Sequence, residues 1–525
     1  MQNSIYQSWE TPEITIIATD NNGVAIMDFS SKKSEYVQYS DCDHDLFDCF
    51  LHNTKKIIGF NLKKTLVNLV ENGLLTWVND ITDNLIDPFI LEHLINEDSK
   101  HEINTLNAET ELQDVIERYT LMKWFSNDNF NFIMKSVEWP LIKVLVDIET
   151  SWIQVNTKYL VDLMDRVDWE IITVWSQLRK ILWTNDINIS SPKQIWDILF
   201  GKMWIVVKDK WRTKAGGVSI SAQVLNEIAI DNPDVSLILT YRELLKIKTT
   251  YIEPLLCKVK NWRIHATFNQ IGTSTGRLSS SNPNLQNIPV STDYNVRTAF
   301  ESRDGYILMS ADYSQIELRV LAKLSEDKHL TNAFSTNADI HQETADLLWI
   351  SRNHAKWVNF GIVYGISGVG LATQLWITED EATALIKKYF IKFEWVKKFI
   401  KDTQIFLEDN YFEESMFGRQ RHFVDYKKLD TYEKRRVNRQ AVNARIQGTA
   451  ADIMKIWLVN VSRALSRYDA KILLTIHDEI ILEVKSSEIE EVQKIVEYQL
   501  GIAWVKVNVP LIVNTKIFTN WWTKV

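Results

Sequence analysis

Two acidic motifs, far apart in the sequence, most constrain what this chain can fold into. The first is Asp312-Tyr-Ser-Gln-Ile-Glu-Leu-Arg319, which directly follows the mostly apolar run Tyr306–Ala311. The second is His477-Asp-Glu479, which lies between the apolar runs Ile472–Ile476 and Ile480–Val484. Short runs of this type are typical of buried β-strands. The pattern therefore predicts a strand that ends near Asp312 and a β-hairpin with acids at its tip.

Aspartates at neighbouring strand ends have a specific chemical use. Two of them are the minimum needed to hold two divalent cations about 3.5–4 Å apart, the arrangement that promotes in-line phosphoryl transfer. An acid beside a strand is also typical of an ordinary solvated turn. Either motif alone therefore leaves both interpretations open.

A third motif favours the catalytic interpretation. In Arg352-Asn-His-Ala-Lys-Trp-Val-Asn-Phe-Gly-Ile-Val-Tyr-Gly365, two cations and two aromatic rings recur every four residues, at Arg352, Lys356, Phe360 and Tyr364. On a helix such residues drift slowly around one face. Cations suit a triphosphate, and planar rings suit a sugar or a base. A basic amphipathic helix with core aromatics is the alternative, but the three motifs in this order would rarely occur together by chance.

These motifs resemble the family A DNA polymerases, the group of bacterial DNA polymerase I. The resemblance covers residues 138–525 and extends to further segments: Ser191-Pro-Lys-Gln194, Tyr241-Arg-Glu-Leu-Leu245, Thr275-Gly-Arg-Leu-Ser-Ser280, Pro283-Asn-Leu-Gln-Asn-Ile-Pro289, Asp339-Ile-His341 and Gln447-Gly-Thr-Ala-Ala-Asp452. It implies a DNA-directed DNA polymerase, a nucleotidyltransferase of DNA replication or repair. Such an enzyme adds dNTPs to the 3′ end of a primer on template DNA by two-metal phosphoryl transfer.

The resemblance also implies a role for each matched residue. Asp312 and Asp478, with Tyr313, correspond to the ligands of two Mg²⁺ ions. Lys356 corresponds to the proton donor to pyrophosphate. The dNTP-binding positions correspond to Arg352, Lys356, Phe360, Tyr364, His341 and Glu317, of which Glu317 is the steric gate against a ribose 2′-hydroxyl. The DNA-binding positions correspond to Arg277, Arg439, Asn443, Gln447 and His477.

The resemblance implies a multidomain α/β fold. Residues 1–137 resemble a ribonuclease H-like 3′–5′ exonuclease domain, and residues 138–525 a right-hand polymerase domain. Within the latter we expect a thumb at about 160–265, a palm at about 266–340 and 420–525, and fingers at about 341–419. The palm segments are expected to form one sheet. The form implied is the large fragment, without a 5′-nuclease domain.

The first domain departs from the exonuclease pattern. Active members have an Asp-x-Glu pair on the first strand, where this chain reads Ile16-Ile-Ala-Thr-Asp-Asn-Asn-Gly23. A second aspartate is replaced by Thr65, and the late Tyr-x-x-x-Asp motif is missing from Glu111–Phe125. Asp87 alone cannot build a two-metal site. We therefore predict a degenerate domain without proofreading activity.

Composition agrees with a large soluble intracellular protein, and we expect a monomer in the cytoplasm. The N-terminus has no signal-peptide pattern, and no apolar run approaches the ~20 residues of a membrane span. Cys42, Cys49 and Cys257 show no paired spacing, which fits a reducing compartment without structural zinc. The net charge of −9 argues against a protein that coats DNA, although a polymerase needs only a positive cleft. A single-subunit RNA polymerase, a catalytically inactive DNA-binding module and a scaffold are the competing hypotheses.

Tryptophan is unusually frequent. The chain has 20 tryptophans and only 16 glycines, although glycine averages about 7% of residues. Many of the tryptophans fall where the family has glycine: Trp152, Trp196, Trp204, Trp262, Trp349, Trp376 and Trp395. We hypothesise that UGA codons for glycine have been translated as tryptophan, in which case Trp357 is also glycine, whereas Trp521 matches a family tryptophan. A genuinely tryptophan-rich protein is the alternative.

Overall fold

The structure, a computed structural model, describes residues 13–20, 22–28, 33–42, 44–59, 61–76, 85–95, 132–182, 188–189, 191–208, 211–212, 217–290, 293–423, 425–503 and 509–524. The chain divides into two compact units. The first unit comprises Met1–Trp152, His265–Ser281 and Asp304–Phe518, and the second comprises Ile153–Ile264, Asn282–Arg303 and Thr519–Val525.

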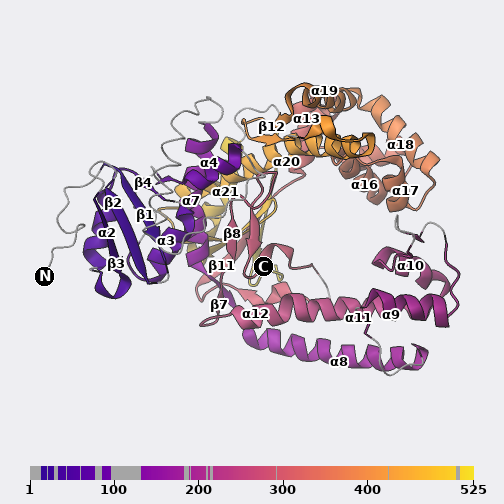
Figure 1. The fold of residues 1–525 in the computed structure, drawn as a ribbon, viewed down its shortest axis with the longest axis horizontal. Coiled ribbons are helices and arrows are strands. Elements are labelled where there is room, and N and C mark those ends of the chain that lie inside the picture. Colours follow the sequence, from indigo (N-terminus) through magenta and orange to yellow (C-terminus); the bar gives the residue numbers. More distant parts are fainter. Residues whose placement is uncertain are drawn as a thin grey trace. The chain divides into compact units, whose positions relative to one another are not determined.

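The first unit begins with a five-stranded sheet (Figure 1). Its order is β3-β2-β1-β4-β5, with β1 Thr15–Thr19, β2 Gly23–Asp28, β3 Ser34–Gln38, β4 Ile57–Ile58 and β5 Leu85–Ile86. Strand β1 is antiparallel to β2 and parallel to β4. Helices α2 His44–Asn53, α3 Leu62–Glu71 and α4 Pro88–Ile95 accompany it. The apolar runs of β1 and β2 are buried, as strands in a sheet core require.

A buried ionic cluster lies where the chain enters the rest of the first unit. The π-helical turn η3 Ile133–Glu138 leads into α7 Trp139–Ser151, which packs against α3. Glu138 accepts hydrogen bonds from Arg419 and from Lys455 Nζ, the latter at 2.7 Å. Burial by itself would raise the pKa of Glu138, but Lys455 and Arg419 outweigh it and lower that pKa to about 2. The cluster therefore fixes the start of α7 by paired charges, whose separation would leave a buried charge unmatched.

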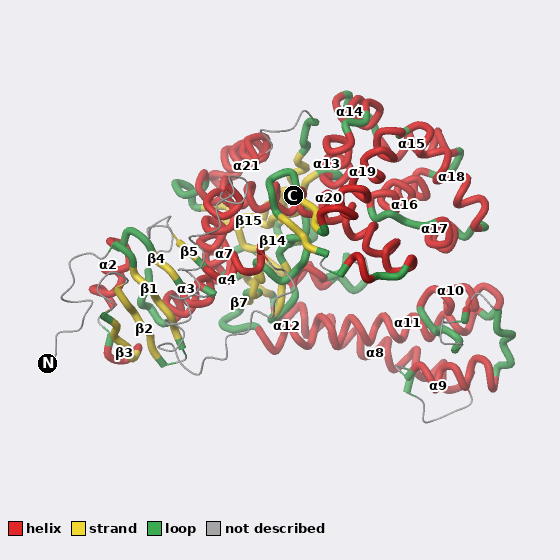
Figure 2. The backbone as a smooth tube through the Cα atoms, turned by 45° about the horizontal axis from the view of Figure 1, so that its top comes forward, coloured by secondary structure: helices red, strands yellow, loops and turns green. Residues whose placement is uncertain are grey.

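The central sheet of the first unit has the order β14-β15-β11-β16; Figure 2 labels β14 and β15, and Figure 1 labels β11. The strands are β11 Tyr306–Tyr313, β14 Ala470–Ile476, β15 Glu479–Lys485 and β16 Val513–Phe518. All neighbouring pairs are antiparallel. Two long helices, α20 Thr431–Ala464 and α21 Ile489–Ala503, pack against each other beside it. The predicted strand before Asp312 and the predicted hairpin around Asp478 are both present.

Helices dominate residues 316–410 of the first unit. They are α13 Ile316–Ser325, α14 Lys328–Ser335, α15 Ile340–Leu348, α16 Arg352–Val363, α17 Gly368–Leu375, α18 Glu379–Lys392 and α19 Glu394–Asn410. Side-chain caps define several starts: Asp327, Asp339, Ser351 and Ser367 each accept a backbone N–H, and Thr378 forms a capping box with Glu381. A hairpin of β12 Phe412–Glu414 and β13 Gln420–His422 follows.

The second unit is mainly helical. Its helices include α8 Thr157–Leu182, α9 Pro192–Trp196, α10 Ala222–Asp231, α11 Ser236–Lys246 and α12 Glu253–Lys258. Helices α8 and α11 pack side by side (Figures 1 and 2). A small sheet of order β10-β6-β7, formed by Phe300–Glu301, Ile153–Val155 and Arg263–Ile264, completes this unit. None of the helices among the described residues is both long enough and apolar enough to span a membrane.

The expectation that residues 266–340 and 420–525 build one sheet is confirmed for the strands next to Asp312 and Asp478 but does not hold for every strand of these segments. Strands β8 Thr267–Asn269 and β9 Ser279–Ser281 pair only with each other, and β10 belongs to the small sheet of the second unit. These strands have two or three residues, and β9 is entirely serine. Phe268 and Phe300 are nevertheless buried, so these strands pack in the core but are too short to extend the ladder of the central sheet.

Candidate functional site

The strand register brings Asp312 and Asp478 to the same edge of the central sheet. Asp312 pairs with Glu479 across β11 and β15. The backbone N–H of Tyr313 donates to the carbonyl of Asp478 at 3.1 Å. Asp478 lies in the tight turn between β14 and β15, beside His477, whose φ is 52°. Two carboxylates from distant parts of the sequence are thus neighbours, as the two acidic motifs predicted.

This edge carries concentrated negative charge. Burial, followed by the charges of Glu479 and Asp478, raises the pKa of Asp312 to about 6, although the charge of Lys516 opposes the shift. Burial also raises the pKa of Asp478, against the opposing effect of Arg277. Arg277 Nη2 lies 3.9 Å from Asp478 Oδ1. Carboxylates that repel one another in a partly buried place favour a cation as an additional partner.

The donor set at this edge fits magnesium. Carboxylate and carbonyl oxygens are its preferred protein ligands, and Mg²⁺ usually keeps several waters and binds substrate phosphates. The Tyr313 side chain is buried, with its ring edge-on to Trp457 at 4.8 Å between centroids. What Tyr313 can offer at the edge is therefore its main-chain carbonyl. Within the described ranges no group of three or more His, Cys, Asp and Glu side chains is arranged to hold a metal.

Helix α16 presents the predicted cations and rings. Its N-cap Ser351 accepts a hydrogen bond from the N–H of His354, so Arg352 is the first helical residue. Arg352 Nε donates to Asp339 Oδ2 at 2.7 Å. Asp339 also caps α15, and the hydrogen bond from Arg352 is the main reason that its pKa is lowered. The start of α16 is therefore tied to the start of α15.

His341 of α15 packs against Phe360 of α16. Its Nδ1 lies 3.0 Å from Asn359 Nδ2, and the rings of His341 and Phe360 have centroids 5.7 Å apart. Burial lowers the pKa of His341, and the nearby positive charges of Arg352 and Lys356 act in the same direction. The imidazole is therefore neutral near pH 7, when it can donate one hydrogen bond and accept another.

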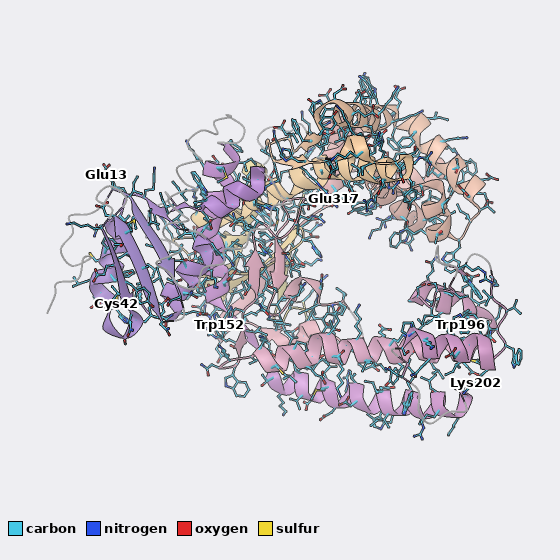
Figure 3. The ribbon with its side chains drawn as sticks, viewed as in Figure 1. Glu13, Cys42, Trp152, Trp196, Lys202 and Glu317 are labelled. Atoms are coloured by element: carbon cyan, nitrogen blue, oxygen red, sulfur yellow. The ribbon has the colours of Figure 1, made fainter. Side chains whose placement is uncertain are left out.

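Glu317 is a buried carboxylate at the start of α13 (labelled in Figure 3). Only 4% of its surface is exposed, and it accepts a hydrogen bond from Arg277 Nη2. Burial raises the pKa of Glu317 even though Arg277 opposes the shift. The pKa of Tyr364 rises to about 12, through burial first and the charge of Glu317 second. Arg277, Glu317 and Tyr364 thus form one electrostatic unit.

One cavity of about 420 Å³ collects most of the predicted site residues. Its lining includes Gln315 and Ile316 together with Arg277, Glu317, His341, Arg352, Lys356, Phe360, Tyr364, His477 and Asp478. Asp312 and Tyr313 are not among its lining residues, although the N–H of Tyr313 donates to the carbonyl of Asp478, which is one of them. A second cavity, of about 400 Å³, is lined by Phe360 and Tyr364 and also by Trp357, Gly365 and Arg439. The two aromatic rings therefore border both cavities.

Helix α20 carries the remaining predicted residues. Arg439, Asn443 and Gln447 recur every four residues on it and so share a face. A hydrogen bond from Gln447 acts on Tyr364 and partly offsets the rise in its pKa. A Cβ added at Gly365, whose φ is +64°, would lie 2.7 Å from Arg439 Cγ. Glycine at 365 thus permits the close approach of α16 and α20.

Sequence reasoning assigned no role to four residues of the site. Asp339 and Asn359 hold Arg352 and His341, whereas Gln315 and Ile316 line the first cavity. Asp339 carries a recognisable signal, because an Asp directly before a helical pattern is a typical N-cap. Asn359 is a polar residue on an otherwise buried face of α16, which also singles it out.

Comparison with known proteins agrees with this geometry. The model of "DNA polymerase family A" matches residues 157–523. DNA polymerase I of Caldicellulosiruptor bescii is 40% identical over 419 residues, covering 77% of this chain and 48% of that protein. The thermostable DNA polymerase I of Thermus aquaticus is 37% identical over 403 residues, covering 74% and 48%. The chain spans about half the length of these curated relatives.

A solved structure is similar over nearly the whole chain. It is the polymerase domain of Pol1 from M. smegmatis in complex with DNA primer–template and dNTP. Its TM-score is 0.87 at 26% identity, covering 97% of this chain and 95% of that one. The α/β architecture is thus that of this polymerase domain. The chain belongs to DNA polymerase family A.

Proposed function

We propose that this chain is a DNA-directed DNA polymerase that extends a primer 3′ end with dNTPs on a DNA template. The observation that carries this proposal is the first cavity, where two cations, two aromatic rings, a buried carboxylate and Asp478 converge. The similar structure from M. smegmatis holds primer–template and dNTP. Both ligands are the substrates that such a cavity would accept.

The sheet edge would hold the metals. Asp312, Asp478 and the carbonyl of Tyr313 are the proposed ligands of two Mg²⁺ ions. When bound, these ions would activate the primer 3′-hydroxyl and neutralise charge on the departing pyrophosphate. The raised pKa of Asp312, about 6, supports this assignment because a nearby cation would relieve the repulsion that causes it.

Helix α16 would bind the triphosphate. Arg352 and Lys356 lie one turn apart at the cavity, and His341 adjoins them. Arg352 is oriented by Asp339, which reduces the freedom it loses on binding. Lys356 would bind phosphate oxygens as a compact charge and donate a proton to the leaving pyrophosphate.

Glu317, Phe360 and Tyr364 would select the sugar and the base pair. Arg277 holds the Glu317 carboxylate, so it forms a fixed polar wall of the cavity. Such a wall would exclude a ribose 2′-hydroxyl by steric conflict. The Phe360 ring would pack on the sugar, and Tyr364 would lie at the template base, where aromatic stacking is favourable.

The primer–template would be held by polar residues around the site: Arg277, Arg439, Asn443, Gln447 and His477. The helical second unit would act as the thumb, and α15–α19 as the fingers. We infer a monomer with a role in replication or repair. Three of these residues share one face of α20: Arg439, Asn443 and Gln447. This arrangement supports contact with a single extended ligand such as the primer–template.

The N-terminal sheet would be a degenerate ribonuclease H-like exonuclease domain. Asp20 accepts hydrogen bonds from the N–H groups of Asn22 and Gly23 and from the Tyr36 hydroxyl. Asp87 accepts one from the N–H of Leu62 at 2.7 Å. Both carboxylates therefore support local structure. The segment Glu111–Phe125, where a third ligand motif was expected and not found, lies outside the described residues.

Primer extension with and without Mg²⁺ tests the polymerase. Lys356→Ala should lower the single-turnover extension rate by about 100-fold, whereas Lys387→Ala, an exposed lysine of α18, should leave it unchanged. Preference for dNTPs over rNTPs would separate a DNA polymerase from an RNA polymerase. Equal rates for both lysine variants would contradict the proposed role of α16.

A mismatched primer tests the N-terminal assignment. The chain should leave a mismatched 3′ end intact in Mg²⁺ or Mn²⁺ when dNTPs and pyrophosphate are absent. Excision that persists in Asp478→Ala would have to come from a second site and would overturn the assignment.

A further inference from the structure

Tryptophans occupy backbone conformations that favour glycine. Among the described residues, thirteen non-glycine residues have positive φ. Four of them are Asn, which tolerates this region, but five are Trp: Trp152, Trp204, Trp262, Trp349 and Trp376, with φ between 38° and 62°. Positive φ is uncommon for any residue with a Cβ, and for a bulky side chain it is a clear outlier. In the described ranges, as many tryptophans as glycines have positive φ.

Two of the five end helices in the manner typical of glycine. Trp349 follows α15 with φ 60° and ψ 44°, and Trp376 follows α17 with φ 59° and ψ 38°. In each case the next N–H reaches back five residues, from Ile350 to the Ala345 carbonyl at 3.1 Å and from Ile377 to Ala372 at 3.2 Å. This is the hydrogen bond of the Schellman motif, in which the left-handed residue is usually glycine.

A third lies in a hairpin turn. The backbones of Lys260 and Arg263 exchange two hydrogen bonds, of 2.8 and 2.9 Å, around Asn261 and Trp262. Both central residues have positive φ, 48° and 62°. This is a type I′ turn, for which Asn-Gly is the preferred pair. Asn261 supplies the first half of that pair, and tryptophan stands where glycine belongs.

The indoles at these positions also make little use of their apolar surface. Trp204 and Trp349 are 82% and 87% exposed, and Trp262 and Trp376 are exposed as well. Trp152 (labelled in Figure 3), with φ 38°, stacks on His265. Apart from Trp152, burial gains at these positions are small, so they do not offset the cost of a left-handed backbone.

Trp521 provides the contrast within the same chain. It is 3% exposed, its ring meets Phe300 edge-on at 5.4 Å, and the Arg297 guanidinium lies 4.5 Å above it. Its φ is not positive. A tryptophan that packs in this way is explained by its contacts, whereas the five left-handed tryptophans are not.

We propose that Trp152, Trp204, Trp262, Trp349 and Trp376 are glycines in the natural protein, because its gene encodes them by UGA codons that the source organism reads as glycine. A single change of codon meaning explains both the backbone geometry and the excess of tryptophan over glycine. The proposal does not depend on the polymerase function.

The proposal changes the candidate site at one position. Trp357 follows Lys356 on α16, is exposed and lines the second cavity beside Phe360 and Tyr364. The backbone at 357 is helical, a conformation that both tryptophan and glycine adopt, so the geometry does not distinguish them. The same reading of UGA as glycine can apply to this position. Glycine at 357 would widen that cavity on the side formed by α16.

The gene and the native protein test the proposal directly. The gene in its source should have UGA at all five left-handed positions and UGG at Trp521. Mass spectrometry of peptides from the native protein should show a residue of glycine mass at each UGA. A UGG codon at any of the five positions, or a tryptophan mass at a UGA position, would overturn the proposal.

Recombinant protein gives a second, independent test. Replacing all five tryptophans by glycine should raise the Tm by at least about 5 °C, because the left-handed strain is removed at five sites. The matched control Trp521→Gly should lower the Tm, since it opens a cavity in a packed core. An unchanged or lower Tm for the five-glycine protein would contradict the backbone argument.

Discussion

The N-terminal sheet and the central sheet both carry aspartates beside strand ends, but they use them differently. In the N-terminal sheet, Asp20 and Asp87 accept hydrogen bonds from nearby backbone N–H groups, and these bonds hold turns and a helix start. In the central sheet, Asp312 and Asp478 lie side by side, and burial and mutual repulsion raise the pKa of Asp312 to about 6. The carboxylates of Asp20 and Asp87 thus have hydrogen-bond donors within the fold. The carboxylates of Asp312 and Asp478 instead lie in a region where negative charges repel one another.

This difference separates structural from functional acids more reliably than their positions in sequence do. A carboxylate with local N–H donors stabilises the fold and has little capacity left for a metal. Carboxylates that are held close together despite their repulsion lower the free energy of unfolding. Such a loss of stability is typical of binding and catalytic sites.

Removing a central-sheet acid should have the largest effect. Asp312→Ala should lower the single-turnover primer-extension rate on the order of 10³-fold or more, because a metal ligand and its electrostatic contribution are lost. Binding of primer–template, measured by fluorescence anisotropy, should change little. An extension rate near that of the unmodified protein would remove Asp312 from the metal site.

Glu317 is a third acid beside the central sheet, and its predicted role is selection. Glu317→Ala should reduce the preference for dNTP over rNTP by about 10–100-fold, since the wall against a 2′-hydroxyl is removed. Phe360→Tyr should ease incorporation of dideoxynucleotides by supplying a hydroxyl near the sugar. Glu343→Ala, on the exposed side of α15, is the control and should leave both ratios unchanged. Unchanged discrimination in both site variants would mean that the sugar lies elsewhere.

Removing an N-terminal acid should affect stability instead. Asp87→Ala leaves the buried N–H of Leu62 without its acceptor, which should cost about 1–3 kcal/mol of unfolding free energy. Denaturant unfolding followed by a probe in the N-terminal sheet measures this loss. If Asp87→Ala were as stable as the starting protein, the carboxylate would not have the structural role assigned to it.

The smallest predicted effect is a gain in stability. The folded pKa of Asp312 lies at about 6 instead of 3.8, so the folded protein binds this proton more tightly than the unfolded chain does. Its contribution to stability is therefore present below about pH 4 and is lost as the pH rises towards 6. In the presence of a chelator, Asp312→Asn should raise the Tm at neutral pH, and this gain should shrink towards about pH 4. A loss of Tm at neutral pH would contradict the repulsion at this edge.

The sequence predicts the parts of the site that depend on local patterns. Apolar runs next to Asp312 and Asp478 identify strands, and a four-residue period identifies the helix that carries Lys356. The ion pair between Asp339 and Arg352 was not predictable from the sequence. It joins the starts of two helices, and only tertiary packing defines their relative position. The pairing of β8 with β9 was missed for a similar reason, since three-residue polar strands have too little pattern to identify a partner.

The most direct test of the contrast compares one acid from each sheet in the same assay. Single-turnover primer extension in Mg²⁺ should be measured for Asp478→Ala and Asp87→Ala, at a temperature where both proteins are folded by circular dichroism. We expect the Asp478 variant to lose on the order of 10³-fold in rate and the Asp87 variant to remain within about twofold of the unmodified chain. Near-normal extension by Asp478→Ala, or an equal loss in Asp87→Ala, would contradict the division of roles between the two sheets.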